Sequence, residues 1–311
     1  MKTLQELDLR GLHVLDGGMA TELEAKGCNL AGPLWSAHVL ETSPETIAEV
    51  HREYLEAGAD CLLSASYQIS AEGYQEIGRS AEDAATALRQ AVAIAENVRR
   101  SYAARTPRKI WIAASLGPYG ATLHNGAEYH GNYDYRFEDL VEFHSRRLGV
   151  LAETTADFIA FETIPSGDEA NAIVTALRRY PDLPASMTFT CKDSAHVAHG
   201  ERLSDCGLLL DVEAQIIGIG VNCTNPKFIR ALIGELIPVT HKPIIVYPNS
   251  GEHWDVEHGR WVGEGETEKF GALAVEWRRA GAEWIGGCCR TRPQHIRAVK
   301  RSLAKGLTPG L

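Results

Sequence analysis

Short apolar segments that alternate with helical segments along the chain predict a (β/α)₈ barrel, the TIM-barrel fold of the α/β class. Three observations carry this prediction. The strand candidates are mostly continuous apolar runs, as expected of parallel strands that are buried on both faces. The segments between them have helical periodicity. The chain of 311 residues has the length that eight such units need.

Eight strand candidates follow one another along the chain. The first leads from an apolar run into the turn Asp16-Gly17-Gly18, and the last ends at Gly287. Most are bounded by turn residues, which is typical of strands in α/β units. They cover residues 12–18, 61–66, 110–115, 158–162, 185–190, 216–222, 243–247 and 283–287.

The helix candidates have recognisable starts and stops. Ser43-Pro44 is a good helix start, and Gly58 is a plausible stop for the same helix. In the segment 82–104 apolar residues recur every three or four positions, from Ala84 to Val98. The helix candidates cover residues 19–30, 43–57, 82–104, 137–155, 168–180, 203–213, 226–236, 266–280 and 293–304.

One connection is unusually long. After Gly117-Pro118-Tyr119-Gly120 the chain continues to about Tyr135 with many Gly, Tyr, His and Asn residues. Long loops in compact domains are often functional, and the tyrosines favour that interpretation. A doubly wound sheet is the alternative fold, but no Gly-x-Gly-x-x-Gly follows the first strand. No linker divides the chain, so residues 1–311 are predicted to form a single domain.

Composition excludes several classes of function. The chain is 44% hydrophobic and 23% charged, which is ordinary for a globular protein with a large core. Its formal net charge of −10 argues against nucleic-acid binding, and no apolar run is long enough to span a membrane. Seven cysteines spread over the chain do not indicate a disulfide framework. We therefore expect a cytoplasmic protein with reduced thiols.

Chemically active residues gather at the predicted carboxyl ends of the strands, where barrel enzymes carry their sites. Two adjacent cysteines, Cys288 and Cys289, end the last strand, and Cys223 ends the sixth. Three thiolates suit a tetrahedral zinc ion and leave its fourth position open. A redox disulfide between Cys288 and Cys289 is the competing interpretation. The remaining cysteines are interpreted as small buried hydrophobic residues.

Acidic and polar residues follow other strands. Asp16 and Glu162 end apolar runs, where an unpaired charge is costly. They are interpreted as a site for a cationic group such as an amino-acid ammonium, with a salt bridge to Arg290 as the alternative. The same rule places further candidates for substrate binding at the mouth of the barrel: Ser66, Tyr67 and Asn249. No histidine has convincing ligand spacing.

Taken together, several motifs resemble the zinc- and homocysteine-binding methyltransferases over roughly residues 12–300. The general motifs are Asp16-Gly17-Gly18, Gly220-Val221-Asn222-Cys223 and Gly286-Gly287-Cys288-Cys289. Three others resemble more narrowly the homocysteine S-methyltransferases that use S-methylmethionine or S-adenosylmethionine: Ser115 to Gly120, Phe161-Glu162-Thr163 and Tyr247 to Glu252.

The resemblance implies a reaction and a set of roles. It implies zinc on Cys223, Cys288 and Cys289, with Glu162 and the Asp16-Gly17 turn holding the amino-acid end of L-homocysteine. Zinc would activate the homocysteine thiol for attack on the methyl group of a sulfonium, giving methionine. Aromatic faces are expected around the sulfonium cation, and the candidates are Trp35, Tyr67, Tyr119 and Tyr129.

Several points stay open at this stage. Betaine-using relatives carry a C-terminal extension, and the chain ends soon after the last helix, so betaine is not the expected donor. Selenohomocysteine or selenocysteine is an alternative acceptor. A non-catalytic zinc- or thiol-binding barrel and a thiol oxidoreductase are alternative functions. The resting fourth zinc ligand is Asn222, a tyrosine or water. A monomer or weak homo-oligomer is expected.

Overall fold

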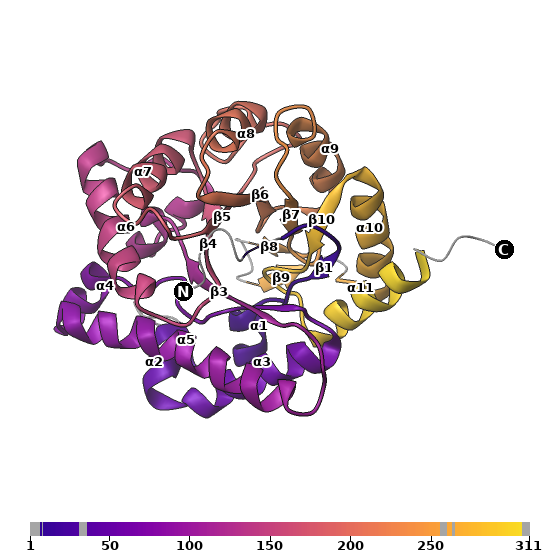
Figure 1. Cartoon of the computed structure of the whole chain (residues 1–311), viewed down its shortest axis with the longest axis horizontal. Coiled ribbons are helices and arrows are strands. Elements are labelled where there is room, and N and C mark those ends of the chain that lie inside the picture. Colours follow the sequence, from indigo (N-terminus) through magenta and orange to yellow (C-terminus); the bar gives the residue numbers. More distant parts are fainter. Residues whose placement is uncertain (1–6, 8, 31–35, 256–259, 263–264, 307–311) are drawn as a thin grey trace.

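Eight parallel strands form a barrel inside a ring of helices (Figure 1), which confirms the predicted fold. The computed structural model describes residues 7, 9–30, 36–255, 260–262 and 265–306. The barrel strands are β1 His13–Val14, β2 Cys61–Leu63, β3 Trp111–Leu116, β4 Phe158–Ile164, β5 Ala185–Phe189, β6 Ile216–Asn222, β7 Ile244–Tyr247 and β10 Ala282–Ile285.

The sheet closes on itself. The strand order is β1-β10-β7-β6-β5-β4-β3-β2, and every pairing within it is parallel. A bridge between Leu15 and Cys61 joins β1 to β2 across the remaining gap, and the Asp16 amide donates to the Cys61 carbonyl at 3.2 Å. Closure removes exposed strand edges and brings all eight carboxyl ends to one mouth.

The helices cover the outer face of the barrel. As predicted, α3 starts at Pro44 after Ser43 and stops at Gly58, which has a φ of 110°. A capping box between Ser80 and Asp83 starts α5. The helices are α1 Met19–Ala25, α2 Ser36–Thr42, α3 Pro44–Ala57, α4 Ala71–Glu76, α5 Ala81–Ala103, α6 Phe137–Ala152, α7 Gly167–Leu177, α8 Leu203–Asp211, α9 Pro226–Leu236, α10 Thr267–Ala280 and α11 Pro293–Gly306.

A second, smaller core fills the barrel interior. Trp111, Phe158 and Trp284 are buried there, and the Trp284 indole donates to the Leu9 carbonyl at 2.6 Å. His13 stacks on Trp284 with ring centroids 4.4 Å apart. His13, Trp111 and Phe158 are the first residues of their strands. They fill that end of the barrel, so the opposite end is the one available for a site.

Some elements differ from the sequence prediction. The short helices α2 and α4 were not predicted, nor was the hairpin of β8 His253–Asp255 and β9 Arg260–Val262. The connection after β3 contains two 3₁₀ turns, η2 Tyr119–Leu123 and η3 Ala127–Tyr129. Helix α1 ends at Ala25 rather than Leu30, because the chain turns at Gly27 with a φ of 83°.

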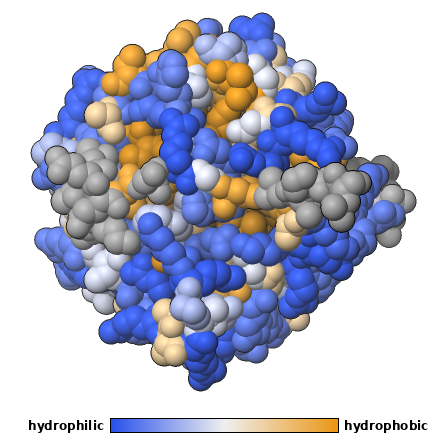
Figure 2. Space-filling view, turned by 45° about the vertical axis from the view of Figure 1, so that its right-hand side comes forward, coloured by the Kyte–Doolittle hydropathy of each residue, from blue (hydrophilic) through white to orange (hydrophobic). Residues whose placement is uncertain are grey.

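The surface is largely polar on the face shown in Figure 2, where hydrophobic residues appear in patches among hydrophilic ones. Ion pairs such as Arg202–Glu235, at 2.7 Å, contribute to this polar surface. Within the described residues, no helix is both long and apolar enough to cross a membrane.

Candidate active site and metal centre

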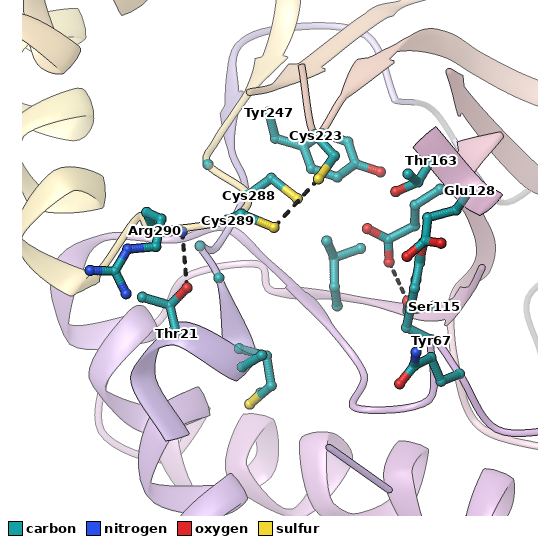
Figure 3. Close-up of a pocket in the computed structure, with 18 of the residues that line it drawn as sticks. Thr21, Tyr67, Ser115, Glu128, Thr163, Cys223, Tyr247, Cys288, Cys289 and Arg290 are labelled. Atoms are coloured by element: carbon teal, nitrogen blue, oxygen red, sulfur yellow. Dashed lines mark hydrogen bonds between the residues drawn. The ribbon is translucent and has the colours of Figure 1, made fainter. Parts of the chain in front are cut away.

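A cavity of about 430 Å³ opens at the carboxyl ends of the strands. Most of the barrel strands, or the loops that directly follow them, contribute side chains to its lining (Figure 3). Among the sequence-predicted residues, those that line it are Gly17, Tyr67, Tyr129, Glu162, Cys223, Cys288 and Cys289.

The three predicted cysteines meet at one side of this cavity (Figure 3). Cys223 directly follows β6 with a φ of 47°, and its amide donates to the Tyr247 carbonyl at 3.2 Å. The amide of Cys288 donates to the Pro248 carbonyl at 2.8 Å. Gly287 is required before the pair, because a Cβ there would lie 2.3 Å from the Thr291 hydroxyl oxygen.

The spacing of the three sulfurs fits a metal ion. All three Sγ atoms lie within 4.8 Å of one another, and those of Cys223 and Cys289 are 3.4 Å apart. Sulfurs bound tetrahedrally to zinc at about 2.3 Å lie roughly 3.8 Å from each other. The set is therefore sized for a tetrahedral ion with one position left over.

The electrostatics of the cluster also favour a cation. The pKa of Cys289 is lowered well below its ordinary value because its sulfur accepts hydrogen bonds from Cys223 and Cys288. The pKa of Cys288 is raised, first through its hydrogen bonds to the other two sulfurs and then by burial and their charge. Cys289 thus loses its proton easily, and Cys288 does so with difficulty because a negative charge is already present. A bound cation removes this repulsion and allows three thiolates.

Glu162 faces the cavity from a bulge in β4. The register of β4 against β5 shifts between Phe161 and Ile164, so the strand is irregular at Glu162. The Glu162 side chain accepts a hydrogen bond from the Ser115 hydroxyl (Figure 3). Burial raises the pKa of Glu162 to about 7, although hydrogen bonds from Ser115 and Tyr247 act in the opposite direction. Among the described residues no lysine or arginine pairs with it.

The residue after Glu162 is strained and held in place from β6. Thr163 has a φ of 61°, which is rare for a β-branched residue. Its amide donates to Asn222 Oδ1 at 2.7 Å, and Asn222 Nδ2 donates to the Thr163 hydroxyl at 2.8 Å. Asn222 is fully buried. This amide side chain therefore fixes the bulge that presents Glu162.

Asp16 contributes a second buried acid near the cavity. Its Oδ2 accepts from the Leu63 amide at 2.9 Å, while its Oδ1 is buried without a hydrogen-bond partner among the described residues. Burial raises the pKa of Asp16 well above its ordinary value. The next residue, Gly17, lines the cavity beside Tyr54, whose hydroxyl oxygen would lie 2.9 Å from a Cβ at Gly17.

Two of the predicted aromatic residues reach the cavity. Tyr67 is half-buried after β2, and the Tyr129 hydroxyl lies 3.6 Å from Cys223 Sγ. Tyr119 instead lies outside the cavity lining, where it packs edge-on against Phe143 with ring centroids 5.2 Å apart. Trp35 lies outside the described residues.

Two other predicted residues also lie outside the cavity lining. The Ser66 hydroxyl donates to the Ser115 carbonyl at 2.7 Å, so it supports the strand that carries the hydroxyl partner of Glu162. Asn249 Oδ1 is buried without a hydrogen-bond partner among the described residues. Arg290, a possible partner of the acids, forms an ion pair with Glu252 at 3.3 Å.

The cavity also contains residues that the sequence did not single out. Glu128 and His124 come from the long connection after β3, and Tyr247 ends β7. The Tyr247 hydroxyl lies 2.7 Å from the Thr188 hydroxyl oxygen and donates toward Glu162. Because Tyr247 ends a predicted strand, its position could have identified it as a cavity residue. Nothing in the sequence set Glu128 apart from other loop residues.

Fold and site together define a barrel with three convergent thiols and two buried carboxyl groups at its mouth. A family profile described as homocysteine S-methyltransferase matches residues 13–303. The chain is 46% identical to homocysteine S-methyltransferase YbgG of Bacillus subtilis, with 94% of this chain and 95% of the relative covered. It is 43% identical to a selenocysteine Se-methyltransferase of Brassica oleracea, with 94% and 90% covered.

A solved structure gives the same result. The metallated form of the homocysteine methyltransferase MmuM from Escherichia coli superposes with a TM-score of 0.85 at 38% identity, covering 94% of this chain and 96% of that one. The chain belongs to the homocysteine S-methyltransferase family.

Proposed function

We propose that this protein is a zinc-dependent enzyme that transfers a methyl group from a sulfonium donor to L-homocysteine, forming methionine. The donor is S-methylmethionine or S-adenosylmethionine. The donor's sulfur–methyl bond breaks, its electron pair stays on the donor sulfur, and a neutral thioether leaves. The new bond forms on the homocysteine sulfur, whose proton is released. The single observation that carries this proposal is the convergence of three cysteine sulfurs in a cavity that also holds Glu162.

The cysteines are the proposed metal ligands. Cys223 is anchored through its amide to β7, and Cys288 through its amide to the segment after β7, so the sulfurs are positioned before any ion arrives. A zinc ion held by Cys223, Cys288 and Cys289 would act as a Lewis acid that keeps the substrate thiol deprotonated. The similar homocysteine methyltransferase MmuM has a solved metallated form, which supports a metal in this protein.

Glu162 is the proposed partner of the homocysteine ammonium. Its carboxyl group is buried, and its pKa is raised to about 7 by that burial. An ammonium beside it favours the charged form and supplies a charge-assisted hydrogen bond. The unpartnered Oδ1 of Asp16 and the close backbone approach at Gly17 support a role for this turn at the same end of the substrate.

The remaining surface of the cavity serves alignment and exclusion of water. Apolar side chains such as Leu63, Ala65 and Met19 line it beside Tyr67. The volume of about 430 Å³ falls within the range of small-molecule sites. Holding both sulfur compounds in line accelerates a displacement that needs no proton transfer to the leaving group.

A selenium acceptor is a second candidate, favoured by the Brassica relative that is named a selenocysteine Se-methyltransferase. Selenocysteine is shorter by one methylene than homocysteine. With its selenium at the metal, selenocysteine would therefore hold its ammonium closer to the cysteine sulfurs than homocysteine does, and so displaced from the proposed position beside Glu162. The two acceptors can be separated by comparing kcat/KM for selenocysteine, selenohomocysteine and L-homocysteine.

The test is methionine formation by zinc-loaded protein from L-homocysteine, with S-methylmethionine, S-adenosylmethionine and betaine supplied separately. We expect turnover with at least one sulfonium and none with betaine. Absence of turnover with both sulfonium donors, in protein shown to hold zinc, would contradict the proposed function. Turnover with betaine would contradict the proposed donor class.

A further inference from the structure

Glu128 lines the cavity but belongs neither to the proposed metal ligands nor to the proposed ammonium site. It belongs to the 3₁₀ turn η3, in the long connection between β3 and α6. Its side chain lines the cavity, and Figure 3 shows it on the opposite side from Cys288 and Cys289. The next residue, Tyr129, brings its hydroxyl to 3.6 Å from Cys223 Sγ. Glu128 therefore faces the cysteines across the space that a methyl donor must occupy.

The carboxyl group of Glu128 is incompletely satisfied. Its Oε2 is buried and has no hydrogen-bond partner among the described residues. Burial is the main reason that the pKa of Glu128 is raised, and the charge of Cys289 adds to it. A buried carboxylate oxygen without a hydrogen-bond partner is destabilising relative to one that is paired. A cation in the cavity offsets this cost.

Aromatic rings flank the same space. Tyr67 lines the cavity together with Glu128, and the pKa of Tyr67 is raised first by burial and then by the charge of Glu128. Tyr129 follows Glu128 directly and also lines the cavity. A carboxylate beside aromatic rings suits a soft, weakly hydrated cation better than a small inorganic ion. Sulfonium is a cation of this kind.

Glu128 differs from Glu162 in its surroundings. Glu162 receives hydrogen bonds from the hydroxyls of Ser115 and Tyr247, which is the environment of a fixed ammonium site. Glu128 receives none from a side chain among the described residues. Two substrates enter the cavity and each carries positive charge. Two separate carboxylates match this requirement.

The loop presents Glu128 in a fixed position. The amide of Ala127 donates to Asn125 Oδ1 at 3.1 Å, and the amide of Gly131 donates to the Ala127 carbonyl at 2.8 Å. Gly120 packs against this turn so closely that a Cβ there would lie 2.8 Å from the Glu128 amide nitrogen. The backbone position of Glu128 is thus preorganised by the loop.

We propose that Glu128 selects the methyl donor by its charge, with the carboxylate facing the positive sulfonium. The inference rests on the proposed function, because it assigns the donor side of that reaction. The sulfonium loses its charge as the methyl group leaves, so this interaction is strongest before the transition state. Glu128 therefore stabilises the bound donor more than the transition state, so it raises donor affinity and does not accelerate the reaction of the bound complex. The neutral thioether product binds without this contribution and is released.

The test compares a cationic donor with its neutral thioether in wild type and Glu128→Gln, which keeps the shape and removes the charge. We expect KM for S-methylmethionine to rise roughly tenfold or more. The inhibition constant of methionine, measured against donor at saturating homocysteine, should change by less than about threefold. KM for homocysteine should change as little, and kcat should stay equal or rise, because the lost interaction stabilises the bound donor more than the transition state. Glu128→Asp should keep most of the preference for the cation.

A matched control and a second readout make the outcome decisive. Asp134→Asn removes the same charge from an exposed position in the same connection and should leave donor affinity unchanged. Calorimetric binding of S-methylmethionine and methionine gives the charge preference without turnover. Equal weakening of both ligands in Glu128→Gln would overturn the inference. Wild type that prefers S-methylmethionine in binding but shows no turnover would remove the proposed function and leave the inference standing.

Discussion

His144 Nε2 lies 2.9 Å from Glu169 Oε1, and both side chains are fully buried behind the cavity. Arg147 donates to the other ring nitrogen of His144 at 2.9 Å, so Nε2 carries the proton and donates to Glu169. Burial lowers the pKa of His144 to about 4, in agreement with a neutral ring.

Glu169 also holds the connection that carries Glu128 and Tyr129. Its carboxylate accepts from the Tyr119 amide at 2.6 Å and from the Tyr133 hydroxyl. These two residues flank the turn η3 on either side. One buried carboxylate at the start of α7 therefore fixes both ends of the segment that covers the thiols.

Glu169→Gln should destabilise the protein and loosen this segment. The carboxylate accepts two of its hydrogen bonds at Oε1 and one at Oε2, so in either orientation the new amide nitrogen meets at least one donor. This leaves buried groups unpaired and costs about 2–4 kcal/mol of unfolding free energy. Donor KM should rise while zinc stoichiometry stays at the wild-type value. Chemical denaturation and steady-state kinetics measure these effects. Asp168→Asn, at the exposed neighbouring position, is the control. Unchanged stability in Glu169→Gln would contradict the assigned role.

His51 predicts a loss of stability in acid. The ring is fully buried in α3, neither nitrogen has a hydrogen-bond partner among the described residues, and burial lowers its pKa to about 4. An unfolded histidine binds a proton below about pH 6.5. Stability is therefore complete above pH 6.5 and falls as the pH drops toward 4, by up to about 3 kcal/mol from this residue.

Replacement of His51 by leucine should reduce this loss. Urea unfolding at pH 7.5 and pH 5 gives the difference for each variant. His241→Gln, on the exposed surface, should keep the wild-type dependence. The account of His51 is wrong if the leucine variant loses as much stability between the two pH values as the wild type.

Asn222→Ala should disturb Glu162 without touching the cavity. Without the amide, the strained Thr163 loses the hydrogen bonds to its amide and hydroxyl groups. We expect an unfolding free energy lower by about 2–3 kcal/mol and a KM for homocysteine raised roughly tenfold. Kinetics at saturating donor provide the measurement. An unaltered homocysteine KM would show that the bulge keeps its shape without Asn222.

Glu162 predicts a pH dependence of homocysteine binding. With a pKa of about 7, its carboxyl group is charged above that pH and increasingly neutral below it. The kcat/KM for homocysteine should fall as the pH drops through 7, because the neutral form attracts an ammonium weakly. Glu162→Gln should lower kcat/KM by roughly 10–100-fold and lose this dependence. A Gln variant with the wild-type profile would remove Glu162 from the ammonium site.

The sequence was informative wherever regular strands determine position. Parallel strands of a closed barrel end at one mouth, so Cys223 and Cys288 could be brought together in advance although 65 positions separate them. The same rule placed Glu162 and Tyr67 at the mouth of the barrel, and both line the cavity. Continuous apolar runs and helix caps were sufficient for the eight strands and most helices.

The strand-end rule did not predict which side chains enter the cavity once the chain has left the strand. Ser66 and Tyr67 are adjacent after β2, yet Tyr67 lines the cavity and the Ser66 hydroxyl turns to Ser115. Tyr119 packs behind the loop because Glu169 binds its amide from the far side. Such choices depend on contacts between distant segments, which no local pattern contains. For the same reason, the sequence did not identify Glu128 as a residue of the cavity.

The central claim is that methyl transfer depends on a zinc ion held by the three cysteines. It is tested most directly by measuring zinc content and methionine formation together in wild type, Cys288→Ser and the control Cys28→Ser, whose cysteine lies outside the cavity lining. We expect about one zinc per chain and matching activity in wild type and control, with both lost in Cys288→Ser. Full turnover by the zinc-free protein, or by Cys288→Ser, would contradict the account.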